Sequence, residues 1–455
     1  MNTPLPRALT SVFLLVLSCV PLGAQPVERA EVEALRARVR ELELQLQGLM
    51  SRLDRPARGE GRPEDREGPA PAPAVSPHAP AASEAVRLRT LVHVDARTFL
   101  AGDGRDSLLL RRARLVAEGT VAPRLRYYLV SDFGGSAVSL LDASLAFDVA
   151  SGLQLKAGKF KSPLGMEILH PAHAVTFTER TLVSGLVPNR DVGVALAATG
   201  AEGRWQGTVG VFNGGVDGTH TGNQDFDGER EWVGRMVTTP WRGSSVAAAR
   251  GLTLGIGGSH GRRRTSEGRP LGYRTPGLEN YFLYRGTVVA DGAAWRLSPQ
   301  LDYRLGPLGV FGEYVVSASR LSPGNGAATR SVRHHAWQLT TGYVLTGEES
   351  TSTGLVPRAP FDPALGTWGA FEVVGRWSEA SLDAAAFPHL AAPETSGTGA
   401  RSLALGLNWH LSGAVRAMFD YYYSRFEAWG GAPTVPGVVR RPDESVFVSR
   451  LQLAF

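Results

Sequence analysis

The sequence predicts an all-β protein: a 16-stranded antiparallel transmembrane β-barrel, preceded by an N-terminal coiled-coil helix and a Pro-rich linker. Three observations lead to this fold class. The N-terminus has the form of an export signal, no later stretch is long and apolar enough for a transmembrane helix, and residues 86–455 alternate apolar and polar side chains in short segments. The sheet is expected to close, because an open edge would leave backbone N–H and C=O groups unpaired in hydrocarbon.

Residues 1–24 are predicted to be a signal peptide. Arg7 supplies a positive charge, the apolar run from Ala8 to Leu22 has the length of a signal-peptide core, and Gly23 and Ala24 offer a cleavage site. Cys19, the only cysteine, falls inside this segment, so disulfides, Cys–zinc sites and thiol nucleophiles are excluded from the mature chain. The sequence leaves open whether Cys19 is lipidated.

Residues 27–53 are predicted to form a coiled coil and residues 54–85 a linker. Apolar residues recur in steps of three and four along the first segment, at Val32, Leu35, Val39, Leu42, Leu46, Leu49 and Leu53. A helix this short is marginal alone in water, which favours self-association. The second segment is rich in Pro and Ala, which favours an extended spacer without a packed core.

Residues 86–455 are predicted to form the barrel. Sixteen strands are expected near 86–99, 108–121, 124–133, 140–149, 153–160, 191–199, 205–213, 231–240, 251–260, 293–304, 308–318, 334–345, 366–378, 401–411, 415–426 and 445–455. The links between them alternate between short turns, such as Gly306-Pro307, and long loops, such as 161–190, which is typical of bacterial outer-membrane barrels. The link 346–365 is an exception, because it is long where a short turn is expected.

Alternation also assigns the basic residues to a face. Leu115 and Leu129 are expected to face lipid, so the basic residues of opposite parity point into the lumen, since a charge at the lipid midplane would cost about 2–4 kcal/mol. Strict alternation sends Arg111 outward, and it puts Lys159 and Lys161 off the lumen face unless Gly158 marks a β-bulge. The candidate anion path comprises Arg111, Arg112, Arg114, Arg124, Arg126, Lys156, Lys159 and Lys161.

The link 161–190 is a candidate constriction. In sixteen-stranded pores the third external loop often folds into the channel, and here it carries Glu167, Arg180 and Arg190 as candidate lining residues. The alternative is that these are ordinary loop residues, and that the lumenal arginines pair with lumenal carboxylates to keep the interior soluble. The expected carboxylates are Glu118, Asp142, Asp148, Glu313 and Glu372.

Several segments resemble the phosphate-selective porin O and P family, in order along nearly the whole of 86–455. They include Leu110-Arg111-Arg112-Ala113-Arg114-Leu115, the run from Gly158 to Glu167, the run from Val187 to Gly193, Gly210-Val211-Phe212-Asn213-Gly214, and Gly406-Leu407-Asn408-Trp409. The resemblance implies a sixteen-stranded homotrimeric barrel with arginines and lysines along an anion path. It also implies that the basic lumen wall of the family falls on Arg111, Arg112 and Arg114.

The expected function is therefore passive diffusion of small anions, with inorganic phosphate or polyphosphate first among them, across the outer membrane. Outer-membrane lipid and lipopolysaccharide are the expected surroundings of the barrel, and the periplasm is the expected site of the coiled coil. The alternatives are a general, weakly selective porin and a structural tether of the envelope. An enzyme is not expected, since neither Gly-x-Ser-x-Gly nor His-Glu-x-x-His occurs, and no cofactor, metal or nucleic-acid partner is expected.

Overall fold

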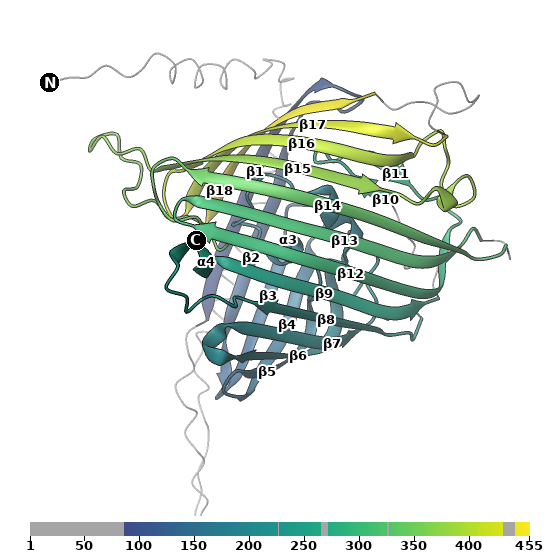
Figure 1. Ribbon diagram of the computed structural model, residues 1–455, viewed down its shortest axis with the longest axis horizontal. Helices are drawn as coiled ribbons and strands as arrows, with labels where there is room; N and C mark the ends of the chain where they lie inside the picture. Colours follow the sequence, from purple (N-terminus) through teal and green to yellow (C-terminus); the bar gives the residue numbers. More distant parts are fainter. Residues whose placement is uncertain (1–85, 226, 265–271, 325–326, 431–441) are drawn as a thin grey trace, which may run out of the picture. The chain divides into compact units, whose positions relative to one another are not determined.

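The computed structural model describes residues 86–225, 227–264, 272–324, 327–430 and 442–455. The predicted signal peptide (1–24), coiled coil (27–53) and linker (54–85) lie outside these residues. Within them, sixteen strands form one closed antiparallel barrel in which β1 pairs with β18, which confirms the predicted barrel (Figure 1). The barrel strands are β1 (Arg87–Ala101), β2 (Ser107–Ala122), β3 (Leu125–Asp132), β4 (Ser139–Ala150), β5 (Leu153–Lys161), β6 (Arg190–Gly200), β7 (Trp205–Phe212), β8 (Glu231–Thr238), β9 (Leu252–Arg263), β12 (Val289–Leu305), β13 (Leu308–Ser322), β14 (Arg330–Val344), β15 (Ala370–Ser381), β16 (Gly397–His410), β17 (Val415–Ala428) and β18 (Glu444–Ala454).

The remaining elements of the described chain are short and lie in the links. A two-stranded sheet, β10 (Gly272–Arg274) with β11 (Asn280–Leu283), stands between β9 and β12 and was not predicted. The helices are α3 (Met166–Leu169), α4 (Ala247–Arg250) and the 3-10 turns η1 (Leu182–Leu186), η2 (Ala201–Gly203) and η3 (Ala384–Ala386). None of these helices has the length and apolar character needed to cross a membrane.

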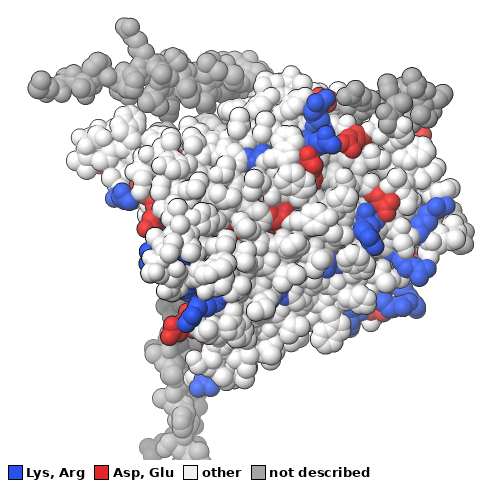
Figure 2. Space-filling view, viewed as in Figure 1, with Lys and Arg blue, Asp and Glu red and all other residues white. Residues whose placement is uncertain are grey.

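Side chains alternate along the strands as the sequence predicts. In β16, Leu403 and Leu405 are exposed on the outside, while Ser402 and Ala404 are buried on the inside. On the face shown in Figure 2, the outer surface is largely uncharged over its middle band, and most charged groups lie toward the strand ends. This arrangement keeps charge away from the depth where it costs most in a membrane.

The two ends of the barrel differ in their links. Short turns join β2 to β3, β4 to β5, β12 to β13 and β16 to β17 at one end, and the long links leave from the other end. The unexpectedly long link 345–369 leaves from the short-turn end, and its Leu355 is buried in a small cluster with Val344 and Ala370. A Cβ added to its Gly354 would lie 3.6 Å from Cδ2 of His173, a residue of the link between β5 and β6. This link therefore contacts the link between β5 and β6.

Loops fill part of the barrel interior with an apolar core. Its buried side chains come from the links after β5, β9 and β15 and pack against inward-facing residues of β12, β13 and β14, such as Val315 and Ala336. Phe282 in β11 stands at the centre of several aromatic contacts, with ring centroids 4.8 Å from Tyr284 and 5.5 Å from Tyr273. A close-packed interior of this kind leaves no path for solutes through that sector of the lumen.

Candidate anion pathway

The loop between β5 and β6 crosses the lumen. The Glu313 carboxylate on β13 accepts the N–H groups of Met166 (2.7 Å) and Glu167 (3.1 Å), and Asp420 on β17 accepts the N–H of Thr178 (2.6 Å). In the closed strand order, β13 and β17 lie several strands away from β5 and β6 on either side. The loop therefore reaches across the interior to the opposite wall.

Glu167 holds this loop together. Its Oε2 accepts hydrogen bonds from the Thr181 N–H (3.0 Å), the Thr181 hydroxyl (2.8 Å) and the Ser184 hydroxyl (2.7 Å), and its Oε1 lies 3.7 Å from Nη1 of Arg376 on β15. The side chain is buried. Glu167, a candidate lining residue, is therefore placed as an internal tie of the loop.

Glu179 fastens the far side of the loop to the wall. Its Oε1 lies 2.7 Å from Arg97 on β1, 2.7 Å from Arg111 on β2 and 3.4 Å from Arg450 on β18. Burial opposes ionisation, but the neighbouring guanidinium groups, with Arg111 foremost, outweigh it and hold the pKa of Glu179 well below its usual range. An ionised carboxylate among three arginines is a strong anchor.

Arg111 points into the lumen, contrary to strict alternation. In the pairing of β1 with β2, His93 lies opposite Arg112 and Val94 opposite Leu110, so Arg111 is an extra residue in a β-bulge. The bulge re-aims its side chain toward Glu179, where Nε and Nη2 both donate to the carboxylate. The alternation prediction was wrong here, because a bulge leaves no trace in the apolar pattern.

Several predicted basic residues form ion pairs, as the charge-pairing alternative anticipates. Arg114 lies 2.7 Å from Asp132, Arg190 lies 2.8 Å from Asp142, and Arg126 lies 2.7 Å from Asp148, an exposed pair near the short-turn end. These arginines lie beside the path but carry partners of opposite charge.

Arg124 lies in the turn between β2 and β3, not in a strand. Its φ of +68° is in the left-handed region, and β3 begins one residue later at Leu125. Arg124 therefore lies at the short-turn end of the barrel. The alternation pattern predicts it on the lumen wall, and the structure places it beyond that wall.

Lys161 and Arg180 form the centre of the candidate site. Nζ of Lys161 donates to the carbonyls of Leu169 (3.2 Å) and His170 (2.9 Å), and Nη2 of Arg180 donates to the same His170 carbonyl (2.9 Å). Among the residues the structure describes, no carboxylate lies within 4.0 Å of either cation. Burial, followed by the charges of Arg114 and Arg190, lowers the pKa of Arg180 to about 10 despite the opposite effect of Glu167, so it remains charged at neutral pH. Two cations converge on one oxygen.

Lys156 and Lys159 lie at different places in the barrel. Lys156 lies on the lumen face with Nζ 4.6 Å from the centre of the Phe160 ring, and no described carboxylate is within ion-pair distance of it. Lys159 pairs in register with Ala143 and Val192, and its Nζ reaches Asn223 (2.9 Å) in the link after β7. Gly158 has a φ of +121°, yet the register is unbroken there. Lys159 is thus placed at the rim, away from Lys156.

A second group of cations lines the wall formed by β2, β1, β18 and β17. Nη1 of Arg112 lies 3.0 Å from Nδ1 of His93, whose Nε2 lies 2.9 Å from Oε1 of Gln452, and Arg416 donates to that same amide oxygen (3.1 Å). Arg112 and Arg416 are buried, each with an Nε that lacks a hydrogen-bond partner in the described structure. Sequence reasoning missed His93, whose inward parity was the available signal.

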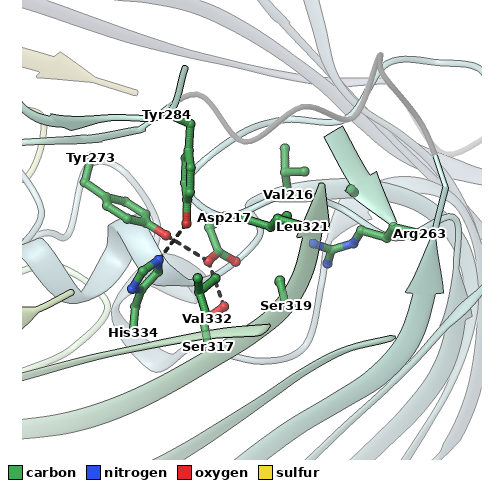
Figure 3. A pocket seen from close by; sticks show the side chains of 11 residues that line it. Val216, Asp217, Arg263, Tyr273, Tyr284, Ser317, Ser319, Leu321, Val332 and His334 are labelled. Carbon is green, nitrogen blue, oxygen red and sulfur yellow. Dashed lines mark hydrogen bonds between the residues drawn. The ribbon is translucent and has the colours of Figure 1, made fainter. Parts of the chain in front are cut away.

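The link after β7 is fastened to the inner wall at β12 and β13 and fills the interior there. Asp217 accepts a hydrogen bond from Nε of Arg296 (2.7 Å). It also accepts from the Ser317 hydroxyl (2.7 Å) and the Tyr273 hydroxyl (3.3 Å), and the Tyr284 hydroxyl and Nε2 of His334 form a hydrogen bond of 2.6 Å beside it (Figure 3). The cavity among these residues is about 20 Å³, enough for a single water molecule. It is no route for an anion.

The comparisons with known proteins agree with this architecture. The family model for phosphate-selective porin O and P matches residues 86–455. The chain is similar in structure to the outer membrane channel DcaP of Acinetobacter baumannii, with 12% identity, a TM-score of 0.53, and coverage of 81% of this chain and 97% of that one. OprB of Pseudomonas putida is also similar, with 12% identity, a TM-score of 0.48, and coverage of 82% and 94%. No curated protein sequence matches the chain.

At 12% identity the DcaP structure supports the fold alone, whereas the family match extends over nearly all of the described residues. The fold and the family are those of a transport channel rather than an enzyme. The match over residues 86–455, together with the closed barrel, shows that the chain belongs to the phosphate-selective porin O and P family and is a porin of the outer membrane.

Proposed function

We propose that this porin conducts small anions selectively, with phosphate or polyphosphate preferred, along a path that passes Lys161 and Arg180. The observation that carries the proposal is the convergence of these two cations on the His170 carbonyl, with no described carboxylate within 4.0 Å. Like charges this close repel each other, and a bound anion relieves the repulsion. The ammonium has three donors and the guanidinium five, so both retain N–H groups for an anion.

The chemistry of the two side chains suits phosphate. A guanidinium offers a planar fork that matches two phosphate oxygens, and an ammonium offers a compact charge that adjusts to a third. Conduction requires that an anion bind well enough to enter and weakly enough to leave. Arg112, Arg416 and Lys156, which also lack a carboxylate partner among the described residues, provide further positions of moderate strength along the lumen.

We also propose a homotrimer in which the coiled coil at 27–53 supports the assembly from the periplasm. The support is the heptad pattern of the sequence and the family resemblance. Residues 27–53 lie outside the described part of the chain, so the coiled coil stays a prediction.

Planar-bilayer recordings test the proposed function. Under a KCl gradient the reversal potential should lie close to the chloride equilibrium potential, and added phosphate should reduce the chloride current in a concentration-dependent manner. Weak selectivity without phosphate block would favour the general porin instead. Absence of current from a folded, inserted barrel would favour the structural tether.

A second recording tests the inward loop. Glu167→Gln removes the charge that receives three hydrogen bonds from Thr181 and Ser184, and bonds to a charged group contribute about 1.5–3 kcal/mol each. The loop should loosen, so that single-channel conductance rises and open-channel noise increases. Asp148→Asn, at an exposed pair near the short-turn end, is the control and should leave both unchanged. Unaltered conductance in Glu167→Gln would show that the loop does not set the narrowest point.

A further inference from the structure

Charged side chains occur on the outer, lipid-directed face of β14 to β17, close to the end with the long links. Arg333 shares its face with exposed Trp337 and Leu339, and Arg401 shares its face with exposed Leu403 and Leu405. Arg425 and Glu427 near the end of β17, together with Glu379 near the end of β15, complete the set. We name Arg333, Glu379, Arg401, Arg425 and Glu427 the outer charged patch. Figure 2 shows blue and red side chains next to each other toward this end of the barrel, where β10 and β11 also lie.

Glu379 is the organising carboxylate of the patch. It accepts the indole N–H of Trp337 (3.2 Å) and that of Trp377 (3.1 Å) from two adjacent strands, and it lies 3.5 Å from Nε of Arg401. Indole rings with an apolar body and one polar atom settle at the boundary between hydrocarbon and head groups. The two tryptophans therefore set the depth of the patch at the head-group level of the leaflet on the long-link side, which is the external side in such barrels.

Arg401 and Arg425 have N–H groups that their carboxylate partners do not occupy and that face outward. Arg401 uses Nε toward Glu379 and Nη2 toward Glu427 (3.0 Å), and its side chain is still 56% exposed. Arg425 uses Nε toward Asp443 (3.4 Å) and is 60% exposed. A guanidinium carries five N–H donors, so each arginine is oriented by its carboxylates and still presents N–H groups to the surroundings. Exposed ion pairs of this kind contribute little to stability. Their main effect is to orient the guanidinium groups of Arg401 and Arg425.

Arg333 adds a charge without a carboxylate within 4.0 Å in the described chain. Its guanidinium carbon lies 5.5 Å from the centre of the Trp295 ring on β12, a cation–π contact that preserves the positive charge. The patch thus contains three cations on neighbouring or next-neighbouring strands. Arg401 lies opposite Glu379 and Arg425 in the strand pairing, and Arg333 lies four residues closer to the long-link end than Trp337, which pairs with Glu379.

The opposite arc of the barrel is different at the same end. The outward-facing strand residues of β18, β1, β2, β3 and β4 carry no charged side chain in the described structure, and the exposed ones include Leu100, Leu108, Leu110 and Leu140. The charges are therefore confined to one arc of the rim, which Arg320 on β13 and Arg262 on β9 extend beyond β14. A phosphate group at head-group depth would find its donors on this arc and not on the opposite one.

We propose that the outer charged patch binds the lipid-linked phosphate groups of a phosphorylated glycolipid in the external leaflet of the outer membrane, through Arg333, Arg401 and Arg425. The planar guanidinium can bind two phosphate oxygens at once. The acyl chains of the same lipid would lie against the exposed apolar residues below, such as Leu403 and Leu405. This site is on the outside of the barrel and does not depend on the anion path in the lumen.

The test is lipid retention by the full-length, refolded protein. Detergent-solubilised protein is mixed with lipopolysaccharide, and bound lipid is measured by native mass spectrometry. The variant Arg333→Gln/Arg401→Gln/Arg425→Gln should bind about a hundredfold more weakly, because each surface arginine is worth roughly a factor of five toward an anionic lipid. The matched control, Arg204→Gln/Arg250→Gln, removes exposed arginines near the short-turn end and should bind as the unmodified protein does.

Two further arms use the unmodified protein, so the outcome does not depend on the folding of a variant. Lipopolysaccharide without its lipid A phosphates should bind about as weakly as the triple variant, and inorganic phosphate at millimolar concentration should compete poorly because it lacks the acyl chains. Equal binding of the dephosphorylated lipid, or full binding by the triple variant, would overturn the proposal. Reversal potential in phosphatidylcholine bilayers should be the same for the triple variant and the unmodified protein, which separates this site from the pore.

Discussion

Replacement of both cations at the centre of the pore, as in Lys161→Gln/Arg180→Gln, should abolish most of the anion selectivity and weaken phosphate block about a hundredfold. Hydrogen bonds to charged groups contribute about 1.5–3 kcal/mol each, so the loss of one such bond from each side chain comes to about 3 kcal/mol. The structural reason is that these two side chains lie beside no described carboxylate within 4.0 Å. Their charge is available to a solute, whereas that of Arg114 or Arg190 is already compensated.

The measurement is the reversal potential under a KCl gradient, with phosphate titrated against the chloride current. Arg126→Gln, which removes a cation paired with Asp148, is the matched control and should change the block by less than about threefold, as expected of an exposed pair. Lys161→Arg/Arg180→Lys retains both charges and should recover most of the selectivity. Wild-type block by phosphate in the double glutamine variant would show that the anion path avoids this pair.

The sequence predicts the barrel well because alternation is a local property. All sixteen strands appear within a few residues of their expected ends, and the inward parity of Arg112, Arg416 and Arg450 follows from the same period of two. Period-two reasoning fails where one extra residue enters a strand, as at Arg111. It also misses β10 and β11, which are three and four residues long and pack under tertiary contacts.

The sequence does not predict which lumenal arginines form ion pairs with carboxylates. Parity shows that an arginine points inward, but whether a carboxylate meets it depends on the path of a loop across the lumen. Glu179 lies more than sixty positions from Arg111 and more than two hundred from Arg450, and only the folded loop brings them together. The separation of paired arginines from unpaired cations, on which the proposed anion site depends, is therefore a property of the structure alone.

Glu179→Gln should produce the largest loss of stability among single changes in the lumen. The substitution removes the carboxylate shared by Arg97, Arg111 and Arg450. It leaves the buried guanidinium groups of Arg97 and Arg450 with Asp95 as their remaining anion, and the half-buried Arg111 without its carboxylate partner. Breaking a buried ion pair by removing one partner costs about 3–5 kcal/mol. The temperature at which the refolded barrel loses its compact migration in gel electrophoresis should fall clearly, whereas Asp148→Asn, at an exposed pair, should leave it unchanged.

The pH dependence of stability distinguishes two effects of Glu179→Gln: loss of the carboxylate charge and disturbed packing of the loop. Because the pKa of Glu179 is held well below the ordinary 4.5, its contribution to stability is complete above pH 4.5 and is lost as pH falls toward the lowered pKa. The unmodified protein should therefore lose this increment on acidification, while Glu179→Gln, which never had it, should not. The two proteins should converge in melting temperature at low pH. A constant gap from pH 7 downward would mean that the amide disturbs the packing of the loop, and that the charge of Glu179 is not what fastens it to the wall.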